Sequence, residues 1–152
     1  MSAHDNYLQQ ALALAARNVE QGGRPFGAVI VRNGDAIAEA VNTLHLDDDP
    51  TGHAELNAIR AVAAHSGSAA LRECVVYASG QPCPMCLSAI YLTGVKEVWF
   101  ANSNGDSETF RLSTAAIYQQ LQQPLDQQTL PIHHLPQPNG LAVYQRWAEK
   151  QS

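Results

Sequence analysis

The chain has 152 residues, of which 45% are hydrophobic and 15% are charged, and its formal net charge at pH 7 is −5. This length allows one domain with a single core, and the composition is typical of a globular protein. No apolar run approaches the roughly 18 residues that a membrane span needs, and the 9 Lys and Arg residues form no cluster, which disfavours a nucleic-acid partner.

The first third of the chain predicts a helix followed by a hairpin of two strands. Apolar residues recur at helical spacing from about residue 5 to residue 21, and Gly22-Gly23 ends this helix. Residues 26–31 form a buried apolar strand, Asn33-Gly34 is a strong signal for a two-residue hairpin, and residues 36–42 supply the second strand. We expect residues 44–50 to form a loop.

The remaining chain alternates helices and strands. Thr51 is expected to cap the next helix, with His53 in its first turn and Gly67 at its end. Residues 74–78 and 96–101 predict strands on either side of a helix at 84–92. A polar loop at 102–109, a helix to about 122, a fifth strand at 130–135 and a helix at 140–150 are expected to follow. This order predicts an α/β fold for residues 1–152, a three-layer α/β/α sandwich with a central mixed five-stranded sheet.

Two short motifs, each expected at the start of a helix, provide residue types that bind zinc. His53 lies upstream of the sequence Pro-Cys-Pro-Met-Cys at 82–86, and catalytic zinc sites use three protein ligands with a fourth position open to water. A spacing of three puts Cys83 and Cys86 on one side of a helical turn, where the positive end of the helix favours thiolates. We therefore predict that His53, Cys83 and Cys86 hold one Zn²⁺ per chain.

Glu55, two residues after His53, is predicted to carry protons without binding the metal. Zinc lowers the pKa of its bound water to about 7. A neighbouring carboxylate can take the water's proton and pass it to a ring nitrogen, and later to the departing ammonia. The predicted reaction is the hydrolytic deamination of an amino-bearing ring carbon.

Three other interpretations of the cysteines and the histidine are weaker or stay open. A redox Cys-x-x-Cys pair would leave His53 and Glu55 without a role. A structural zinc site needs a fourth ligand, and Cys74 begins the strand that leads to Cys83, roughly 16 Å away at about 3.3 Å per residue, so Cys74 is better explained as a core residue. A non-catalytic scaffold stabilised by zinc would keep the ligands yet would not need Glu55.

The cysteine content and the N-terminal residues indicate the cellular compartment. Three cysteines cannot all pair, and two of them have a metal-binding spacing, so a disulfide framework is not expected. The N-terminal residues lack the basic and apolar blocks of a signal peptide. We expect a cytoplasmic protein.

His-Ala-Glu at 53–55, together with Pro-Cys-Pro-Met-Cys at 82–86, resembles the H-x-E…P-C-x-x-C signature of the cytidine and nucleobase deaminase superfamily. The resemblance extends from about Tyr7 to Tyr118 and is greatest to the bacterial guanine deaminase branch. It implies a cytidine deaminase-like fold and the conversion of a free purine-type base, guanine, to xanthine plus ammonia. Because relatives are dimers and some exchange C-terminal segments, it also implies a homodimer with residues 124–152 as the candidate exchanged segment.

The resemblance further implies residues that contact the substrate. Asn42, at the end of the second predicted strand, matches the asparagine that binds the substrate ring in the family. Asp106 falls where the guanine deaminase branch has an aspartate. Phe26 suits either a pocket wall or the core, and Ala54 and Gln81, which belong to the two motifs, complete the expected set.

Departures from the family pattern leave the identity of the substrate open. Gln81 replaces the usual glutamate and cannot carry a proton, and the chain lacks the aromatic last residue of some relatives. Another aminated heterocycle or nucleoside, such as cytosine, a pterin or guanosine, therefore remains an alternative. A tRNA adenosine deaminase is disfavoured, because residues 101–106 lack the basic residues of the A-R-D-x-K-x-G-A segment of those enzymes.

Overall fold

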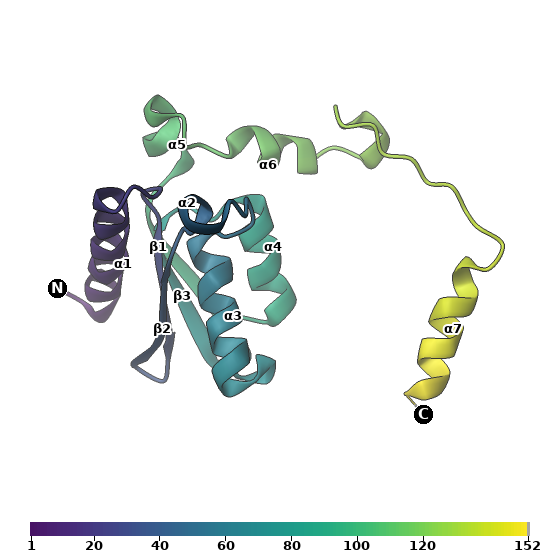
Figure 1. Cartoon of the computed structure of the whole chain (residues 1–152), viewed down its shortest axis with the longest axis horizontal. Coiled ribbons are helices and arrows are strands. Elements are labelled where there is room, and N and C mark those ends of the chain that lie inside the picture. Colours follow the sequence, from purple (N-terminus) through teal and green to yellow (C-terminus); the bar gives the residue numbers. More distant parts are fainter. Residues whose placement is uncertain (152) are drawn as a thin grey trace. The chain divides into compact units, whose positions relative to one another are not determined.

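The computed structural model describes residues 1–151, which form two compact units, one from Met1 to Tyr118 and the other from Gln119 onward. The first unit contains a mixed sheet with the strand order β2-β1-β3-β4 (Figure 1). Strand β1 (Gly27–Arg32) is antiparallel to both β2 (Asp35–Val41) and β3 (Cys74–Gly80). Strand β4 (Glu97–Asn102) lies parallel to β3.

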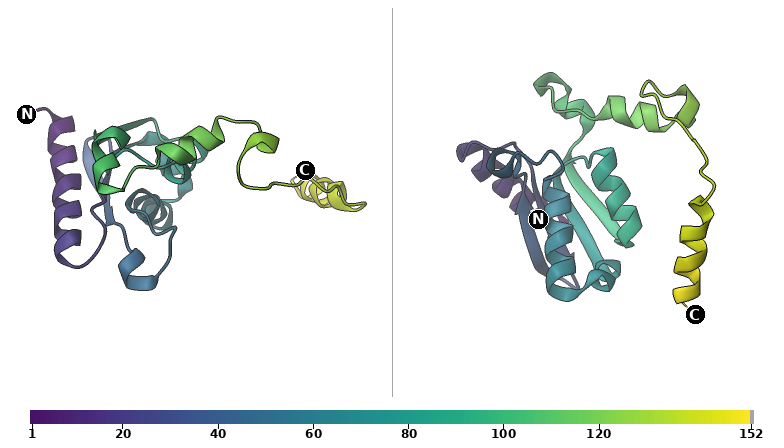
Figure 2. Two further views of the ribbon diagram at one scale, coloured as in Figure 1. Left: turned by 90° about the horizontal axis from the view of Figure 1, so that it is seen from above. Right: turned by 45° about the vertical axis from the view of Figure 1, so that its right-hand side comes forward.

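Helices cover both faces of this sheet, as the three-layer prediction required. Helix α1 (Ala3–Glu20) lies on one face, and α3 (Ala54–Ser66) and α4 (Pro84–Thr93) lie on the other (Figures 1 and 2). Because side chains alternate along a strand, β1 serves both layers. Its residues Val29 and Val31 pack in the cluster under α1, whereas Ala28 and Ile30 pack in the cluster under α3.

Local sequence signals explain the ends of several elements. Ser2 is the N-cap of helix α1, and its side chain forms a capping box with Asp5. The β1–β2 hairpin turns through Asn33 and Gly34, both with positive φ (50° and 84°), as the two-residue hairpin predicts. The predicted end of α3 at Gly67 is confirmed, and no helix within residues 1–151 is both long and apolar enough to cross a membrane.

Two of the predicted loops contain short helices, and one cap differs from the prediction. Residues Leu44–Asp47 form helix α2. The side chain of Asn42, just before this helix, accepts a hydrogen bond from the amide of Leu44. His53, not Thr51, is the N-cap of α3, because the hydroxyl of Thr51 instead donates to Asp49. His53 therefore lies just before the first helical turn and not within it.

The predicted polar loop after β4 is also wrong in part. Residues Asn104–Ser107 form helix α5, and Glu108–Phe110 form a 3₁₀ turn. Ser103 starts α5 through a second capping box with Asp106. Helix α6 (Ala115–Leu121) begins after this irregular stretch, which is later than the sequence suggests.

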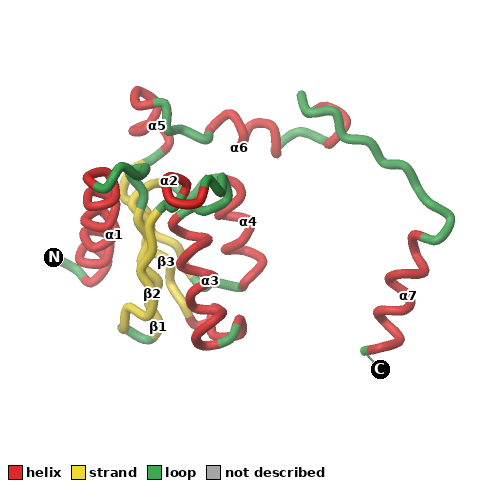
Figure 3. The backbone as a smooth tube through the Cα atoms, viewed as in Figure 1, coloured by secondary structure: helices red, strands yellow, loops and turns green. Residues whose placement is uncertain are grey.

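The predicted fifth strand is wrong, because the sheet within residues 1–151 has four strands. Residues 128–139 have no regular secondary structure, and in Figure 3 this stretch is drawn as loop. Pro131 and Pro136 cannot donate to a strand ladder, which opposes pairing of this segment. The second unit otherwise consists of a 3₁₀ turn at Leu125–Gln127 and the predicted C-terminal helix, α7 (Gly140–Lys150).

Candidate active site

The three predicted zinc ligands come together where α3 and α4 begin. His53 is the N-cap of α3, Cys83 is the N-cap of α4, and Cys86 lies in the first turn of α4. Their donor atoms lie within 4.8 Å of one another. His53 Nδ1 is 3.4 Å from Cys83 Sγ and 3.6 Å from Cys86 Sγ.

These separations fit a tetrahedral zinc ion. Zinc bonds of about 2.0–2.1 Å to nitrogen and about 2.3 Å to sulfur, at tetrahedral angles, place the two donors about 3.6 Å apart. The core residue Cys74 is not part of this cluster; it is fully buried and its thiol donates to the carbonyl oxygen of Ala70. The donor set therefore matches a zinc site with three protein ligands.

The protonation of the two thiols points to the same conclusion. Hydrogen bonds from Cys86 and then from His53 lower the pKa of the Cys83 thiol to about 4. The neighbouring Cys83 sulfur and burial raise the pKa of Cys86, so Cys83 is the thiol that loses its proton first. A hydrogen bond to Cys83 likewise raises the pKa of His53. A divalent cation between these groups would stabilise both thiolates.

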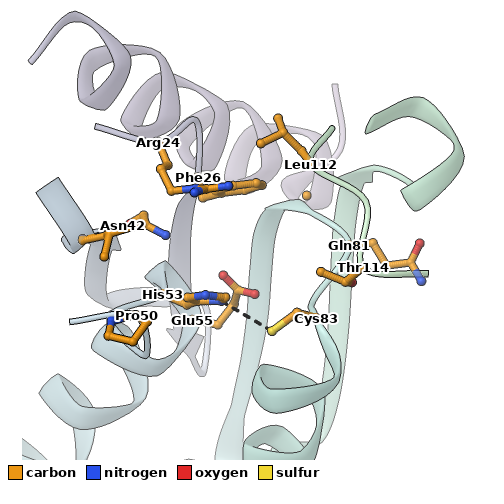
Figure 4. A pocket seen from close by; sticks show the side chains of 12 residues that line it. Arg24, Phe26, Asn42, Pro50, His53, Glu55, Gln81, Cys83, Leu112 and Thr114 are labelled. Carbon is orange, nitrogen blue, oxygen red and sulfur yellow. Dashed lines mark hydrogen bonds between the residues drawn. The ribbon is translucent and has the colours of Figure 1, made fainter. Parts of the chain in front are cut away.

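Glu55 lies beside the ligands and has the environment of a proton carrier. Its carboxyl group faces the cavity between Phe26 and Cys83 (Figure 4). The residue is only 6% exposed, and burial raises the pKa of its carboxyl group above the usual value. A carboxyl group that gains and loses a proton closer to neutral pH is suited to general acid–base catalysis.

A cavity of about 230 Å³ opens above Glu55 and the ligands. It has one aromatic wall, polar groups on several sides and an apolar rim, and the residues that line it belong to loops or element ends. The lining residues are Arg24, Phe26, Asn42, Leu44, Pro50, His53, Glu55, Gly80, Gln81, Cys83, Leu112 and Thr114.

Asn42 has one polar atom available to a ligand. The residue is 3% exposed, and its Oδ1 accepts a hydrogen bond from the amide of Leu44 at 3.0 Å. Its backbone carbonyl accepts from the side chain of Asn18 at 2.9 Å. Within residues 1–151 its Nδ2 has no acceptor, and the amide lies at the cavity in Figure 4. Asn42 can therefore donate a hydrogen bond to a bound molecule.

Of the other residues expected to contact the substrate, two line the cavity and two do not. Phe26 both lines the cavity and packs against the core, so its two proposed roles coexist. Ala54 is fully buried in the core and does not line the cavity. Gln81 lines the cavity. Asp106 instead lines a neighbouring hollow of about 600 Å³, and its carboxylate accepts from the amide of Ser103 at 2.8 Å, which lowers its pKa.

Arg24, Leu112 and Thr114 line the cavity but were not expected from the sequence. Thr114 precedes α6 and its carbonyl accepts from the amides of Ile117 and Tyr118. A polar residue before an apolar helix could have indicated this N-terminal position. No sequence signal connects Thr114 with the other residues of the cavity, which lie 30 or more positions earlier in the chain apart from Leu112.

A comparison with protein families identifies the group to which the site belongs. The model for the cytidine and deoxycytidylate deaminase zinc-binding region matches residues 1–102, which include all three ligands and Glu55. The chain belongs to this deaminase family. The match stops at the end of β4, so it does not include Leu112 or Thr114.

Individual deaminases resemble the chain over different lengths. It is 38% identical over 145 residues to guanine deaminase of Bacillus subtilis (strain 168), covering 95% of this chain and 93% of the relative. The crystal structure of guanine deaminase from Bacillus subtilis superposes with a TM-score of 0.91 at 37% identity, covering 98% of this chain and 95% of that one. The tRNA-specific adenosine deaminase of Aquifex aeolicus (strain VF5) is 37% identical over 95 residues, covering 62% of this chain and 63% of the relative.

Family membership and site geometry together define the class of enzyme. The chain is a zinc-dependent hydrolytic deaminase. His53, Cys83 and Cys86 are the residues that would hold the zinc ion, and when bound the ion supplies Lewis-acid chemistry that lowers the pKa of water.

Proposed function

We propose that this deaminase converts free guanine and water to xanthine and ammonia. The observation that carries the proposal is the match to guanine deaminase from Bacillus subtilis, which extends over 95% of the chain in sequence and 98% in structure. The match to the tRNA-specific enzyme covers only 62% of the chain. The guanine deaminase match therefore includes the segment after residue 102, which supplies Leu112 and Thr114 to the cavity.

The cavity suits the proposed reaction residue by residue. The ring of Phe26 offers a flat apolar surface to a purine, and Asn42 Nδ2 can donate to an acceptor on the edge of the base. Glu55 takes one proton from water and transfers it to a ring nitrogen. It then takes the second proton, from the hydroxyl group on the tetrahedral carbon, and transfers it to the departing amine. A carbon–oxygen bond forms and a carbon–nitrogen bond breaks, so guanine and water are converted to xanthine and ammonia.

The size of the cavity favours a free base over a nucleoside or an RNA strand. Its volume of about 230 Å³ is below the range of about 300–1,000 Å³ that is typical of pockets for drug-sized ligands. Ammonia release should be measured from guanine, adenine, cytosine, a pterin, guanosine and a tRNA stem-loop. Guanine is expected to react fastest. No release from guanine while the stem-loop reacts would contradict the choice of a small-molecule substrate.

One observation favours a second candidate, another aminated heterocycle. Within the described residues, Glu55 provides the only carboxylate that lines the cavity. Guanine has neighbouring ring N–H and amino donors, which a second carboxylate would accept well, whereas cytosine presents an amino donor beside two acceptors, a ring nitrogen and a carbonyl oxygen. In the same assay, faster release from cytosine or the pterin than from guanine would select this alternative.

We also propose a homodimer in which residues 124–152 of each copy pack against the other copy. Strand β4 pairs only with β3 within the described residues, so one of its edges is free. Helix α7 carries exposed apolar side chains, with Tyr144 73% and Trp147 65% exposed. Both features favour association, because exposed apolar patches and free strand edges mark interaction surfaces. A sedimentation mass equal to one chain at micromolar concentration would contradict the dimer.

A cytoplasmic location is the compartment that we propose for this enzyme. All three cysteines are free thiols in the structure, and Cys83 and Cys86 need to stay reduced to bind zinc. Fractionation of cells that express the chain should recover the activity in the cytoplasmic fraction. Recovery in an oxidising compartment would contradict the proposal.

A further inference from the structure

We propose that Gln81 and Asn104 form a clamp that positions one wall of the cavity, and that Gln81 acts through this clamp without touching the substrate. This wall is formed by residues 103–114, here called the wall segment, which contribute Leu112 and Thr114 to the cavity. This positioning role replaces the substrate contact that the sequence suggested for Gln81. It does not depend on which base the enzyme deaminates.

The wall segment has little apolar packing to hold it in place. It consists of the four-residue helix α5, a 3₁₀ turn and a connection in which Arg111 has a φ of 59°. Neither α5 nor the 3₁₀ turn contains a buried residue. Segments with few buried apolar contacts open easily, so the position of this wall depends mainly on its hydrogen bonds.

Asn104 provides the central connection of the wall segment. Its amide donates to Gln81 Oε1 at 2.9 Å, which joins the segment to the loop before α4. Its own Oδ1 accepts from the amide and the hydroxyl of Thr114, at 3.3 and 3.5 Å. One residue therefore links the loop before α4 to the part of the wall that faces the cavity.

Two further hydrogen bonds support the clamp at its ends. The amide of Gln81 donates to the carbonyl oxygen of Asn102 at 2.7 Å, directly after the β3–β4 ladder. The hydroxyl of Tyr118 donates to the carbonyl oxygen of Pro82. The wall segment is thus attached to the same short loop both before and after its exposed stretch.

The acceptor atom of the Gln81 side chain is already used by the protein. Its Oε1 accepts from Asn104, and because a backbone amide can only donate, the atom facing it must be the oxygen and not the nitrogen. In Figure 4 the Gln81 amide group points away from Glu55. The Oε1 atom therefore binds a protein group, and the amide is turned away from the proton carrier.

The first test removes one side of the clamp. Asn104→Ala keeps the backbone amide that donates to Gln81 but removes the acceptor for Thr114. We expect KM to rise about three- to tenfold with kcat changed less than about twofold, because the wall contributes to binding and not to proton transfer. The base used is whichever one reacts fastest with the wild-type enzyme, so failure of the guanine proposal is detected separately.

Two variants control for a general structural effect. Asn104→Asp keeps the acceptor oxygen and should restore KM to within about twofold of wild type. Asn102→Ala changes the same residue type two positions earlier, where no side-chain hydrogen bond forms within residues 1–151 and the side chain lines only the neighbouring hollow. It should leave KM unchanged.

A second readout does not depend on activity. Amide hydrogen exchange at Thr114 should become at least about tenfold faster in Asn104→Ala, and exchange at Asn104 should do so in Gln81→Met, since each loses its acceptor. Zinc content should stay at one per chain in both. Unchanged exchange and unchanged KM in these two variants would overturn the clamp, as would an equal response in Asn102→Ala.

The Gln81→Glu variant tests the rival role of proton transfer at this position. Glutamate keeps an acceptor for the amide of Asn104. The clamp predicts that kcat is unchanged or lower in this variant. A rise in kcat of tenfold or more would instead assign position 81 to the proton relay and overturn the proposal.

Discussion

The zinc-binding centre and the wall segment face the same cavity but are built in opposite ways. The centre consists of buried cysteines and a half-buried histidine at the starts of helices α3 and α4, with His53 and Cys83 both acting as N-caps. The wall segment is exposed and irregular, and hydrogen bonds to residues 10 and 23 positions away hold it. The comparison indicates that local rules set the chemistry of this enzyme, whereas contacts distant in sequence set the shape of its cavity.

The largest effect should come from removing a ligand. Cys86→Ala should lose zinc and reduce activity to background, because the two remaining ligands cannot form a stable site. Cys74→Ala is the matched control: it also removes a fully buried thiol but lies outside the ligand cluster. The control should retain one zinc per chain, measured by elemental analysis. Loss of zinc in both variants would show that general unfolding, and not ligation, explains the result.

The next largest effect should come from removing the proton carrier. Glu55→Gln keeps the size of the side chain, so zinc should remain bound while kcat falls about 10²- to 10⁴-fold. Single-turnover ammonia release, together with metal analysis, measures both quantities. Activity close to wild type would exclude Glu55 from the proton transfer and favour a different catalytic group.

Changes at Asn42 should have an intermediate effect and sharpen the contrast between chemistry and binding. Asn42→Asp keeps an acceptor for the amide of Leu44 but replaces the free donor with an acceptor. An unpaired polar group in a buried site costs about 1–3 kcal/mol, so we expect kcat/KM to fall about 5- to 150-fold. Steady-state kinetics on the reactive base provides the measurement. An unchanged kcat/KM would remove Asn42 from the substrate contacts.

The smallest effect should come from Asp106. Its carboxylate caps α5 through the amide of Ser103 and lies outside the cavity. Asp106→Asn keeps one acceptor oxygen, so kcat/KM should stay within about twofold of wild type. A loss of kcat/KM greater than tenfold would instead restore the direct role in reading the base that the family resemblance implies.

The same contrast explains how much of the molecule could be predicted from its sequence. The hairpin and the end of α3 follow from short-range signals, Asn33-Gly34 and Gly67, and the structure confirms them. The cysteine spacing indicated donor atoms that the structure brings within 4.8 Å of one another and of His53. The role of Thr114 could not be predicted, because its place depends on a hydrogen bond to Asn104 and a cavity formed by distant segments.

The fifth strand was predicted from apolar residues alone, and this was not sufficient. A strand also requires a neighbour with free hydrogen-bonding groups, and nothing local to residues 130–135 supplies one. The two short helices were missed for the opposite reason. Asn42 precedes α2 and a capping box of Ser103 and Asp106 starts α5, each in a stretch whose composition is typical of a loop.

The free edge of β4 has a consequence for the handling of this enzyme. The outer N–H and C=O groups of residues 97–102 have no strand beside them within the described residues. Phe100, in this strand, is 42% exposed. Such an edge is a template for uncontrolled strand addition. Light scattering should therefore detect association that increases with the concentration of the chain.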